Sequence, residues 1–354
     1  MQQRENWIWL PESSFPDRQT TFYSPLARTR DSLYTVASFT RRYEFGKNPV
    51  RITLTVSGDS AFRLYAGDTL ICRGPAWVGG DFLYNDTPRP NWYAYSLEFT
   101  PESAPELPLW DSGIEFSAQV RMEPVRICEY SKGHGGFFLD GRVTFADGTY
   151  LPISTDESWS AQVLGAYTDH GKYDNGIGDS PVFPAELVQN LWHCEIAPIP
   201  VCSLAPLPFS RTMTVPAGES VKTKIDFDMV YACYLTVSAQ TSGELRAEVR
   251  CSETGESGSG ESFRFVKDGV YSGFELHSAG ELWVEATNAG SEDAVLTVGA
   301  EASAYPVTLE AVTTTSDAEL NKLLRICSHS LRQCRQSMHL DSPRHCEPLA
   351  CTGD

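Results

Sequence analysis

The sequence predicts a mostly β protein with two β-sandwich domains that are followed by one amphipathic helix. Up to about residue 310, short stretches such as Arg51–Val56 and Val221–Phe227 alternate apolar and polar side chains, which is typical of half-buried strands. Turn signals separate these stretches at spacings of about eight to twelve residues. Such spacing indicates sandwiches and argues against a parallel sheet with crossover helices.

Glycine-containing turns mark the expected hairpins of the first domain. Ala66-Gly67-Asp68 lies between two strand-like segments, Ala61–Tyr65 and Thr69–Cys72. Asp140-Gly141 and Asp147-Gly148 are also hairpin signals, because glycine accepts the positive φ that tight hairpin turns require. We therefore expect the chain to reverse direction at each of these positions.

A proline cluster divides the β-rich part of the chain. Four prolines fall within residues 198–208, which suits an extended linker. We therefore expect one sandwich over residues 1–200 and a second over 201–309. Alternating segments at 234–237 and 281–286 continue the second sandwich, and the polar, glycine-rich stretch Glu253–Glu261 predicts a mobile loop between its strands.

The pattern changes to a helical period after Thr313. Ser316 and Glu319 have the spacing of a capping box, in which each side chain accepts a hydrogen bond from a backbone N–H of the first turn. The helix is expected to run for about 22 residues and to stop before Pro343, and its apolar stripe needs other helices to pack against. The residues of this stripe are Leu320, Leu323, Leu324, Cys327, Leu331 and Cys334.

Three carboxylates follow this helix within a short segment that two prolines break. Asp341, Glu347 and Asp354 are separated by Pro343 and Pro348, which favour extended or turn conformation. Sugar hydrolysis uses such a set, with one protonated carboxylic acid for the leaving oxygen and ionised carboxylates that support the oxocarbenium charge. The spacing alone favours an acidic loop that caps a helix and stays in water, because such loops are common.

The same segment resembles the signature of bacterial α-L-rhamnosidases, glycoside hydrolase family 78. The residues that match in register are Asp341, Pro343, Glu347, Leu349, Thr352, Gly353 and Asp354. Cys351 stands where the family usually has a tryptophan that lines the sugar pocket, and His345, Cys346 and Pro348 replace Arg, Asp and Arg. These departures leave Glu347 in place, and they put rhamnose itself in question as the sugar that is bound.

The resemblance implies an activity and a role for each carboxylate. Glu347 would be the general acid, and Asp341 and Asp354 would bind the hydroxyls of the sugar. Residues 310–354 would form the first helix of an (α/α)6 catalytic barrel that is incomplete in this chain, with the general base outside it. The whole enzyme would hydrolyse terminal α-L-rhamnosides with inversion, and this chain alone would be inactive.

Weaker motifs in the first domain resemble the N-terminal domain of the same family. Phe62–Asp68 followed by Arg73-Gly74-Pro75 looks like its hairpin that closes on Gly-Pro. Ala146-Asp147-Gly148 and the later Ser154–Trp159 look like its Ala-Asp-Gly and Thr-Asp-x-x-Trp stretches. Their order ahead of the terminal segment agrees with the order in the family.

Charge and composition exclude several classes of partner. A net charge of -18 and a pI near 4.8 argue against nucleic acid and anionic membranes, since both need basic patches. A neutral carbohydrate is compatible with this charge. We find no glycine-rich phosphate loop, Gly-x-Ser-x-Gly elbow or His-Glu-x-x-His motif, and we expect no cofactor.

Location and cysteine use follow from the same composition. Met1–Pro11 lacks the apolar core of a secretory signal and no stretch approaches about 20 apolar residues, so we expect a cytoplasmic protein. The ten cysteines show no paired C-x-x-C spacing. A Cys/His cluster near the end, from Cys327 to Cys351, fits no common zinc pattern, and Cys327 and Cys334 have the spacing of helix core positions, so we expect no metal.

A second function stays open beside the glycosidase, namely a non-catalytic carbohydrate-binding β-sandwich protein. Aromatic side chains could stack on sugars, although in sandwiches they more often belong to the core. The tryptophans in question are Trp77, Trp92, Trp159, Trp192 and Trp283.

Overall fold

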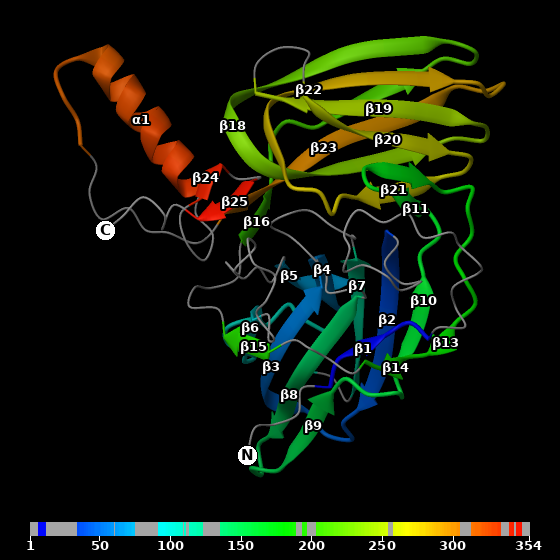
Figure 1. Cartoon of the computed structure of the whole chain (residues 1–354), viewed down its shortest axis with the longest axis vertical. Helices are drawn as coiled ribbons and strands as arrows, with labels where there is room; N and C mark the ends of the chain where they lie inside the picture. Colours follow the sequence, from blue (N-terminus) through cyan, green and yellow to red (C-terminus); the bar gives the residue numbers. More distant parts are fainter. Residues whose placement is uncertain are drawn as a thin grey trace. The chain divides into compact units, whose positions relative to one another are not determined.

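The structure is a computed structural model whose described residues divide into two compact units. The structure describes residues 6–11, 34–59, 61–74, 91–108, 110, 113–122, 135–188, 193–196, 203–253, 258–304, 313–333, 340–342 and 345–348. Some of these are described by their backbone alone, namely 91–93, 193–196, 203–204, 304, 331–333, 340–342 and 345–348. The first unit comprises Met1–Gly165 with Asp179–Val201, and the second comprises Ala166–Gly178 with Cys202–Asp354. Both are built from strands, so the predicted mostly β class is confirmed (Figure 1).

The first unit is a sandwich of two mainly antiparallel sheets. One sheet has the order β14 (Glu186–Leu187), β1 (Ile8–Trp9), β8 (Gly136–Phe145), β3 (Pro49–Asp59), β6 (Asn91–Phe99) and β15 (His193–Ile196), with β9 (Tyr150–Ser154) paired to β8. The other has the order β13 (Phe183–Pro184), β10 (Ser160–Val163), β2 (Thr35–Glu44), β7 (Gly113–Met122), β4 (Ala61–Ala66) and β5 (Thr69–Gly74).

The core of this unit lies between the two sheets. In β3, Ile52, Leu54 and Val56 are buried whereas the threonines between them are half-buried, so the predicted alternation is confirmed. The facing sheet contributes the alternate residues of its own strands to the same cluster. Its buried side chains include Phe39, Phe62, Leu64, Phe116, Ala118 and Val120.

Two of the three predicted turns are confirmed and one is wrong. Gly67 and Gly148 have φ of 54° and 80° and connect β4 to β5 and β8 to β9. Asp140 and Gly141 instead lie in the middle of β8. A Cβ at Gly141 would collide with the carbonyl oxygen of Thr53 on the neighbouring strand. The glycine is therefore needed for close approach of two strands and not for a positive φ.

Replacing Gly141 by alanine is expected to destabilise the first unit by about 1–3 kcal/mol, because the added methyl group forces β3 and β8 apart. Hydrogen exchange of the β3 and β8 amides measures this loss in the first unit, because an unfolding curve of the whole chain would mix the two units. Gly178→Ala is the control, since a Cβ there meets nothing within 4 Å. Equal stability of the two variants would contradict the close-approach explanation.

The second unit is one folded sheet. Its order is β11 (Tyr167–Asp169), β12 (Lys172–Asp174), β20 (Ser259–Phe265), β19 (Leu245–Ser252), β22 (His277–Asn288), β18 (Ser220–Gln240), β23 (Ala294–Ala304) and β16 (Ser203–Pro206), with β17 (Arg211–Val215) paired to β23 and β21 (Gly269–Ser272) paired to β18. Figure 1 shows these strands in the green-to-orange part of the chain.

The long strand β18 folds this sheet into two layers. Segments 221–227 and 234–237, which the sequence predicts as separate strands, belong to this one strand of 21 residues. Its register is interrupted between Asp226 and Tyr231; before that point it pairs with β22, and after it mainly with β23 and β21. Such an irregularity bends a strand. The core between the layers includes Leu235, Val237, Val249, Phe263, Phe265, Leu282, Val284, Leu296 and Val298.

Two expectations about connecting segments need correction. Ser203–Pro206, in the second half of the expected linker, forms β16 at an edge of the sheet, and Leu207 is buried in the core. Proline is tolerated at an edge because its missing N–H interrupts no ladder there. In the expected loop Glu253–Glu261, residues 259–261 belong to β20, and residues 254–257 lie outside the described residues.

One segment belongs to the other unit than its place in the sequence suggests, and this was not expected. Residues 166–178 lie between two segments of the first unit but belong to the second, where β12 pairs in parallel with β20. The map with boundaries at 1–200, 201–309 and 310–354 stays a prediction. The parallel pairing joins segments about ninety positions apart, and no local sequence pattern predicts such a pairing.

Helix α1 (Ala318–Gln333) begins one residue later than predicted. Asp317 is the N-cap, because its Oδ1 accepts hydrogen bonds from the backbone N–H of Glu319 at 2.9 Å and of Leu320 at 3.1 Å. Asn321 completes the cap by bonding the backbone of Thr315. The predicted capping box of Ser316 and Glu319 is therefore wrong: Glu319 is the second helical residue and not the third.

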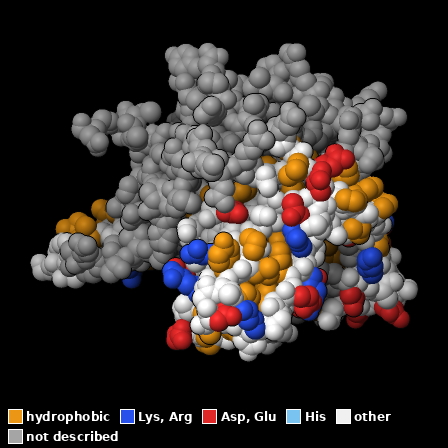
Figure 2. Space-filling model, turned by 90° about the horizontal axis from the view of Figure 1, so that it is seen from below, with side chains coloured by type: hydrophobic (Ala, Val, Ile, Leu, Met, Phe, Trp, Pro, Cys, Tyr) orange, Lys and Arg blue, Asp and Glu red, His pale blue; other side chains and the backbone are white. Residues whose placement is uncertain are grey.

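The surface carries charges of both signs. On the face shown in Figure 2, Asp and Glu side chains of the described residues are interspersed with Lys and Arg and with small hydrophobic areas. No helix among the described residues is long and apolar enough to cross a membrane.

Candidate functional site

The terminal carboxylates lie at the margin of what the structure describes. Asp341 lies in β24 (Leu340–Ser342) and Glu347 in β25 (His345–Pro348), and these strands pair antiparallel. The backbone is extended on both sides of Pro343, as the prolines predict. The side chains of Asp341 and Glu347, and all of Asp354, lie outside the described residues, so their proposed roles stay predictions.

Helix α1, which leads to this segment, is anchored on the bend of β18. The Nε2–H of His329 donates to the carbonyl oxygen of Val230 at 2.6 Å, and its ring packs edge-on against Tyr231 with centroids 5.0 Å apart. Tyr231 donates to Asp228 at 2.8 Å; burial, followed by the hydrogen bond and charge of Asp228, raises the pKa of Tyr231 to about 12. The phenol therefore stays protonated and keeps this anchor at ordinary pH.

One side of α1 exposes large apolar side chains. Leu320, Leu323 and Ile326 are 42%, 54% and 45% exposed. Exposure of these residues at three-residue intervals is typical of a helix surface that packs against other helices.

The second unit contains an open groove of about 480 Å³ over the outer face of β12, β20, β19 and β22. The alternate residues of these strands, such as Val249, Phe263 and Val284, point into the core, so polar residues remain for the outer face. The polar lining includes Lys172, Asp174, Arg246, Glu248, Ser262, Arg264, Glu285 and Thr287.

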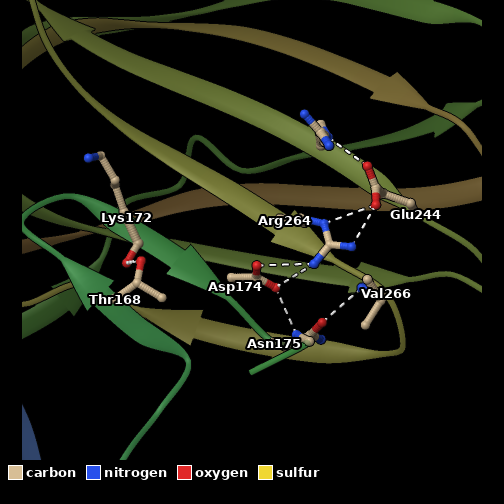
Figure 3. Close-up of polar contacts among 9 residues, drawn as sticks. Thr168, Lys172, Asp174, Asn175, Glu244, Arg264 and Val266 are labelled. Carbon is tan, nitrogen blue, oxygen red and sulfur yellow. Dashed lines mark hydrogen bonds and ion pairs between the residues drawn. The ribbon is translucent and has the colours of Figure 1, made fainter. Parts of the chain in front are cut away.

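Arg264 holds the wall of this groove. Its Nε and one terminal nitrogen donate to Glu244 at 2.9 and 2.7 Å, and its other terminal nitrogen lies 3.1 Å from both carboxylate oxygens of Asp174 (Figure 3). The hydrogen bonds from Arg264, and then from Arg246, lower the pKa of Glu244. Next to Asp174, Asn175 accepts from the N–H of Val266 and donates to the carbonyl oxygen of Lys267, both at 2.8 Å. The β11–β12 hairpin is thereby fastened to the sheet.

The other cations at the groove are paired as well. Lys172 lies 3.0 Å from Asp169, and Arg246 lies 2.6 Å from Glu244. At the rim, Lys222 lies 2.9 Å from Glu285. The groove therefore offers balanced charge and no concentrated positive patch.

A buried polar network crosses the interior of the same unit. Glu261 accepts from Tyr271 through one oxygen, and its other oxygen lies 2.6 Å from Nε2 of His277. Nδ1 of His277 lies 3.0 Å from the hydroxyl of Ser259. Glu261, Tyr271 and His277 are 1%, 3% and 3% exposed. Although the order Ser–His–Glu is that of a nucleophile relay, its carboxylate and imidazole are enclosed in the core, and we assign the network to stability.

Sequence analysis missed this network, yet one signal was present. Glu261 alternates with Phe263 and Phe265, so it occupies an inward-facing position of β20. A carboxylate at such a position needs partners in the core. Nearby, burial and then the charge of Glu261 raise the pKa of the Cys233 thiol to about 12, which keeps that thiol protonated and unreactive.

The aromatic and metal candidates have clear positions where they are described. Trp159 is fully buried and donates to the carbonyl oxygen of Ser154 at 3.0 Å, so its interpretation as core is confirmed. Trp283 is half-buried and donates to Glu281 at 2.9 Å. Trp77, Trp192 and the side chain of Trp92 lie outside the described residues. Within the described part, no group of three or more His, Cys, Asp or Glu side chains could hold a metal ion.

Comparison with known proteins shows similarity in structure. No protein-family model and no curated protein matches the sequence. The structure is similar to the α-L-rhamnosidase from Dictyoglumus thermophilum, with a TM-score of 0.60 and 16% identity, over 97% of this chain and 40% of that enzyme. It is also similar to the α-L-rhamnosidase from Aspergillus terreus, with a TM-score of 0.62 and 14% identity, over 97% of this chain and 41% of that enzyme.

A third similar structure is the Streptomyces avermitilis α-L-rhamnosidase in complex with L-rhamnose, with a TM-score of 0.64 and 13% identity, over 88% of this chain and 33% of that enzyme. At these identities the likeness shows a shared fold. The chain thus has the fold of a part of α-L-rhamnosidases, and it spans at most about two fifths of the length of these three enzymes.

Proposed function

We propose that this chain is part of a glycoside hydrolase that resembles α-L-rhamnosidases and hydrolyses terminal α-L-rhamnosides with inversion. The observation that carries the proposal is the fold shared with three such enzymes over 88–97% of this chain. The terminal segment from Asp341 to Asp354, which resembles the family signature, supports it independently.

In this proposal the three terminal carboxylates act on one sugar. Glu347 protonates the leaving oxygen, while Asp341 and Asp354 accept hydrogen bonds from the hydroxyls of the ring. Inversion also needs a general base on the opposite face of the sugar, with the two carboxyl groups about 6.5–9.5 Å apart so that water fits between them. The base comes from residues outside these 354.

The exposed side of α1 supports a helical partner. Leu320, Leu323 and Ile326 are about half exposed, so covering each of them contributes about 0.7–1.5 kcal/mol, roughly half of the value for a fully exposed side chain. We propose that further helices of an (α/α)6 barrel cover this side, which would also hold the segment after α1 against the rest of the catalytic site.

The stereochemistry of the first product tests the proposal. An enzyme consisting of this chain and the remaining catalytic domain is expected to release β-L-rhamnose first from an aryl α-L-rhamnoside, as followed by proton NMR of the anomeric signal. The 354-residue chain by itself is the control and is expected to show no sustained turnover. Release of α-L-rhamnose would exclude inversion, and turnover by the control chain would exclude an external base.

A further inference from the structure

The groove of the second unit presents two rows of polar side chains. One row runs across neighbouring strands from Lys172 through Ser262 and Glu248 to Glu285, which are cross-strand partners in register. The second runs in the same way through Asp174, Arg264, Arg246 and Thr287. Between the antiparallel partners of β20, β19 and β22 the Cβ atoms lie about 4.5–5.5 Å apart, so the polar ends of these side chains lie within reach of one ligand.

The charge of the groove selects the class of ligand. The lining has three cationic side chains, Lys172, Arg246 and Arg264, and three anionic ones, which are Asp174, Glu248 and Glu285. Because each cation already has a carboxylate within 3.1 Å, a phosphate or sulfate finds no surplus positive charge. A purely apolar ligand would remove water from the polar groups without replacing their hydrogen bonds, whereas a sugar would also contact the aliphatic parts of the side chains, which make up most of the exposed lining.

A hydroxyl group both donates and accepts, and it therefore matches a floor of mixed donors and acceptors. Glu248 and Glu285 lie directly opposite each other, and the cation nearest to Glu248, Arg250, is 3.6 Å away, beyond hydrogen-bond distance. Neighbouring hydroxyls of a ligand would donate to Glu248 and to the lone pairs of Glu285 that its ion pair with Lys222 leaves open. The hydroxyl of Ser262 lies opposite Glu248 on the next strand.

The shape and rigidity of the groove suit a ligand of this kind. Its volume of about 480 Å³ lies within the range of about 300–1,000 Å³ that is usual for small-molecule sites. The ion pairs of Arg264 fix the β11–β12 hairpin that forms one wall (Figure 3). A fixed wall lowers the entropic cost of binding, because no loop has to be ordered by the ligand.

We propose that this groove is a carbohydrate-binding site that recognises a neutral oligosaccharide through its hydroxyl groups. It shares no residue with the terminal carboxylates, so it is a second site beside the catalytic one. It would bind sugar both in a glycosidase and in the non-catalytic carbohydrate-binding protein that the sequence leaves open.

Binding to the full 354-residue chain tests this site. L-rhamnose and a panel of neutral oligosaccharides serve as probes in isothermal titration calorimetry, with inorganic phosphate as the anionic probe. We expect millimolar or tighter binding of at least one neutral sugar. The proposal is overturned if phosphate binds and no sugar does. It is also overturned if no neutral sugar binds with a dissociation constant below about 50 mM.

Variants of the floor locate the binding. Ser262→Trp fills the centre of the groove and is expected to weaken sugar binding at least about 10-fold, and Glu248→Ala by about 10-fold. Thr212→Trp is the matched control, because it places the same side chain at an exposed strand position of β17 outside the groove. Sugar binding that is unchanged in Ser262→Trp, with all variants folded by circular dichroism, places the site elsewhere and refutes the proposal.

The catalytic proposal and this one fail separately. If an enzyme with the remaining catalytic domain shows no hydrolysis, while the 354-residue chain binds a neutral sugar and Ser262→Trp abolishes that binding, only the catalytic proposal fails. If hydrolysis proceeds and no binding of a neutral sugar depends on Ser262, only the groove site fails.

Discussion

Glu347→Gln, in an enzyme that contains this chain and the remaining catalytic domain, is expected to lower kcat for a substrate with a poor leaving group by about 10²–10⁴-fold. Glutamine keeps the size of the side chain but has no proton to transfer. A general acid must stay protonated near working pH, so the proposal requires that the pKa of Glu347 is raised in the whole enzyme. Steady-state kinetics with an alkyl α-L-rhamnoside measure the loss.

The leaving group separates an acid from a binding residue. An activated nitrophenyl rhamnoside needs little protonation, so Glu347→Gln should slow it far less than the alkyl substrate. Asp341→Asn and Asp354→Asn are the controls, because carboxylates that bind hydroxyls affect both substrates alike. Equal losses with both substrates in Glu347→Gln would remove Glu347 from the role of acid, and full activity would remove it from the site.

The fold class was predictable because strand periodicity is a local property. Ile52, Leu54 and Val56 are buried on one side of β3 as their alternation requires, and the turn at Asp147-Gly148 follows from its glycine. Asp140-Gly141 carries the same dipeptide signal in the middle of a strand, because the backbone of β3 lies where a side chain would be. An Asp-Gly dipeptide shows that the backbone can adopt a positive φ. It does not show whether the fold uses the glycine for a turn or for the close approach of two strands.

Contacts between distant segments were beyond such patterns. The parallel pairing of β12 with β20 and the edge strand β16 depend on partners that lie about ninety or more positions away. The groove has the same origin, since its floor combines four segments of which none carries a motif of its own. The terminal carboxylates could be proposed as a site because they are close in sequence, whereas the groove is visible only in the folded sheet.

Loss of the Glu261 carboxylate is expected to have the largest effect on stability. Glu261→Ala leaves Tyr271 and His277 in the core without their shared partner, and breaking a buried network of this kind costs about 3–5 kcal/mol. Hydrogen exchange of the β20 and β22 amides measures the change in the second unit alone, because an unfolding curve of the whole chain would mix the two units. Exchange through opening of this unit should become about 150- to 5,000-fold faster.

Glu261→Gln should be milder, because its amide oxygen can accept from Tyr271 while its amide nitrogen donates to a neutral His277. Glu248→Ala serves as the control: Glu248 is an exposed glutamate in the neighbouring strand β19, and its loss should change stability by no more than about 0.5 kcal/mol. If the β20 and β22 amides exchange equally slowly in Glu261→Ala and in Glu248→Ala, the buried network does not stabilise the unit. The enclosed Ser259–His277–Glu261 arrangement would then require another explanation, and reaction of Ser259 with a fluorophosphonate would show whether the relay is chemically active.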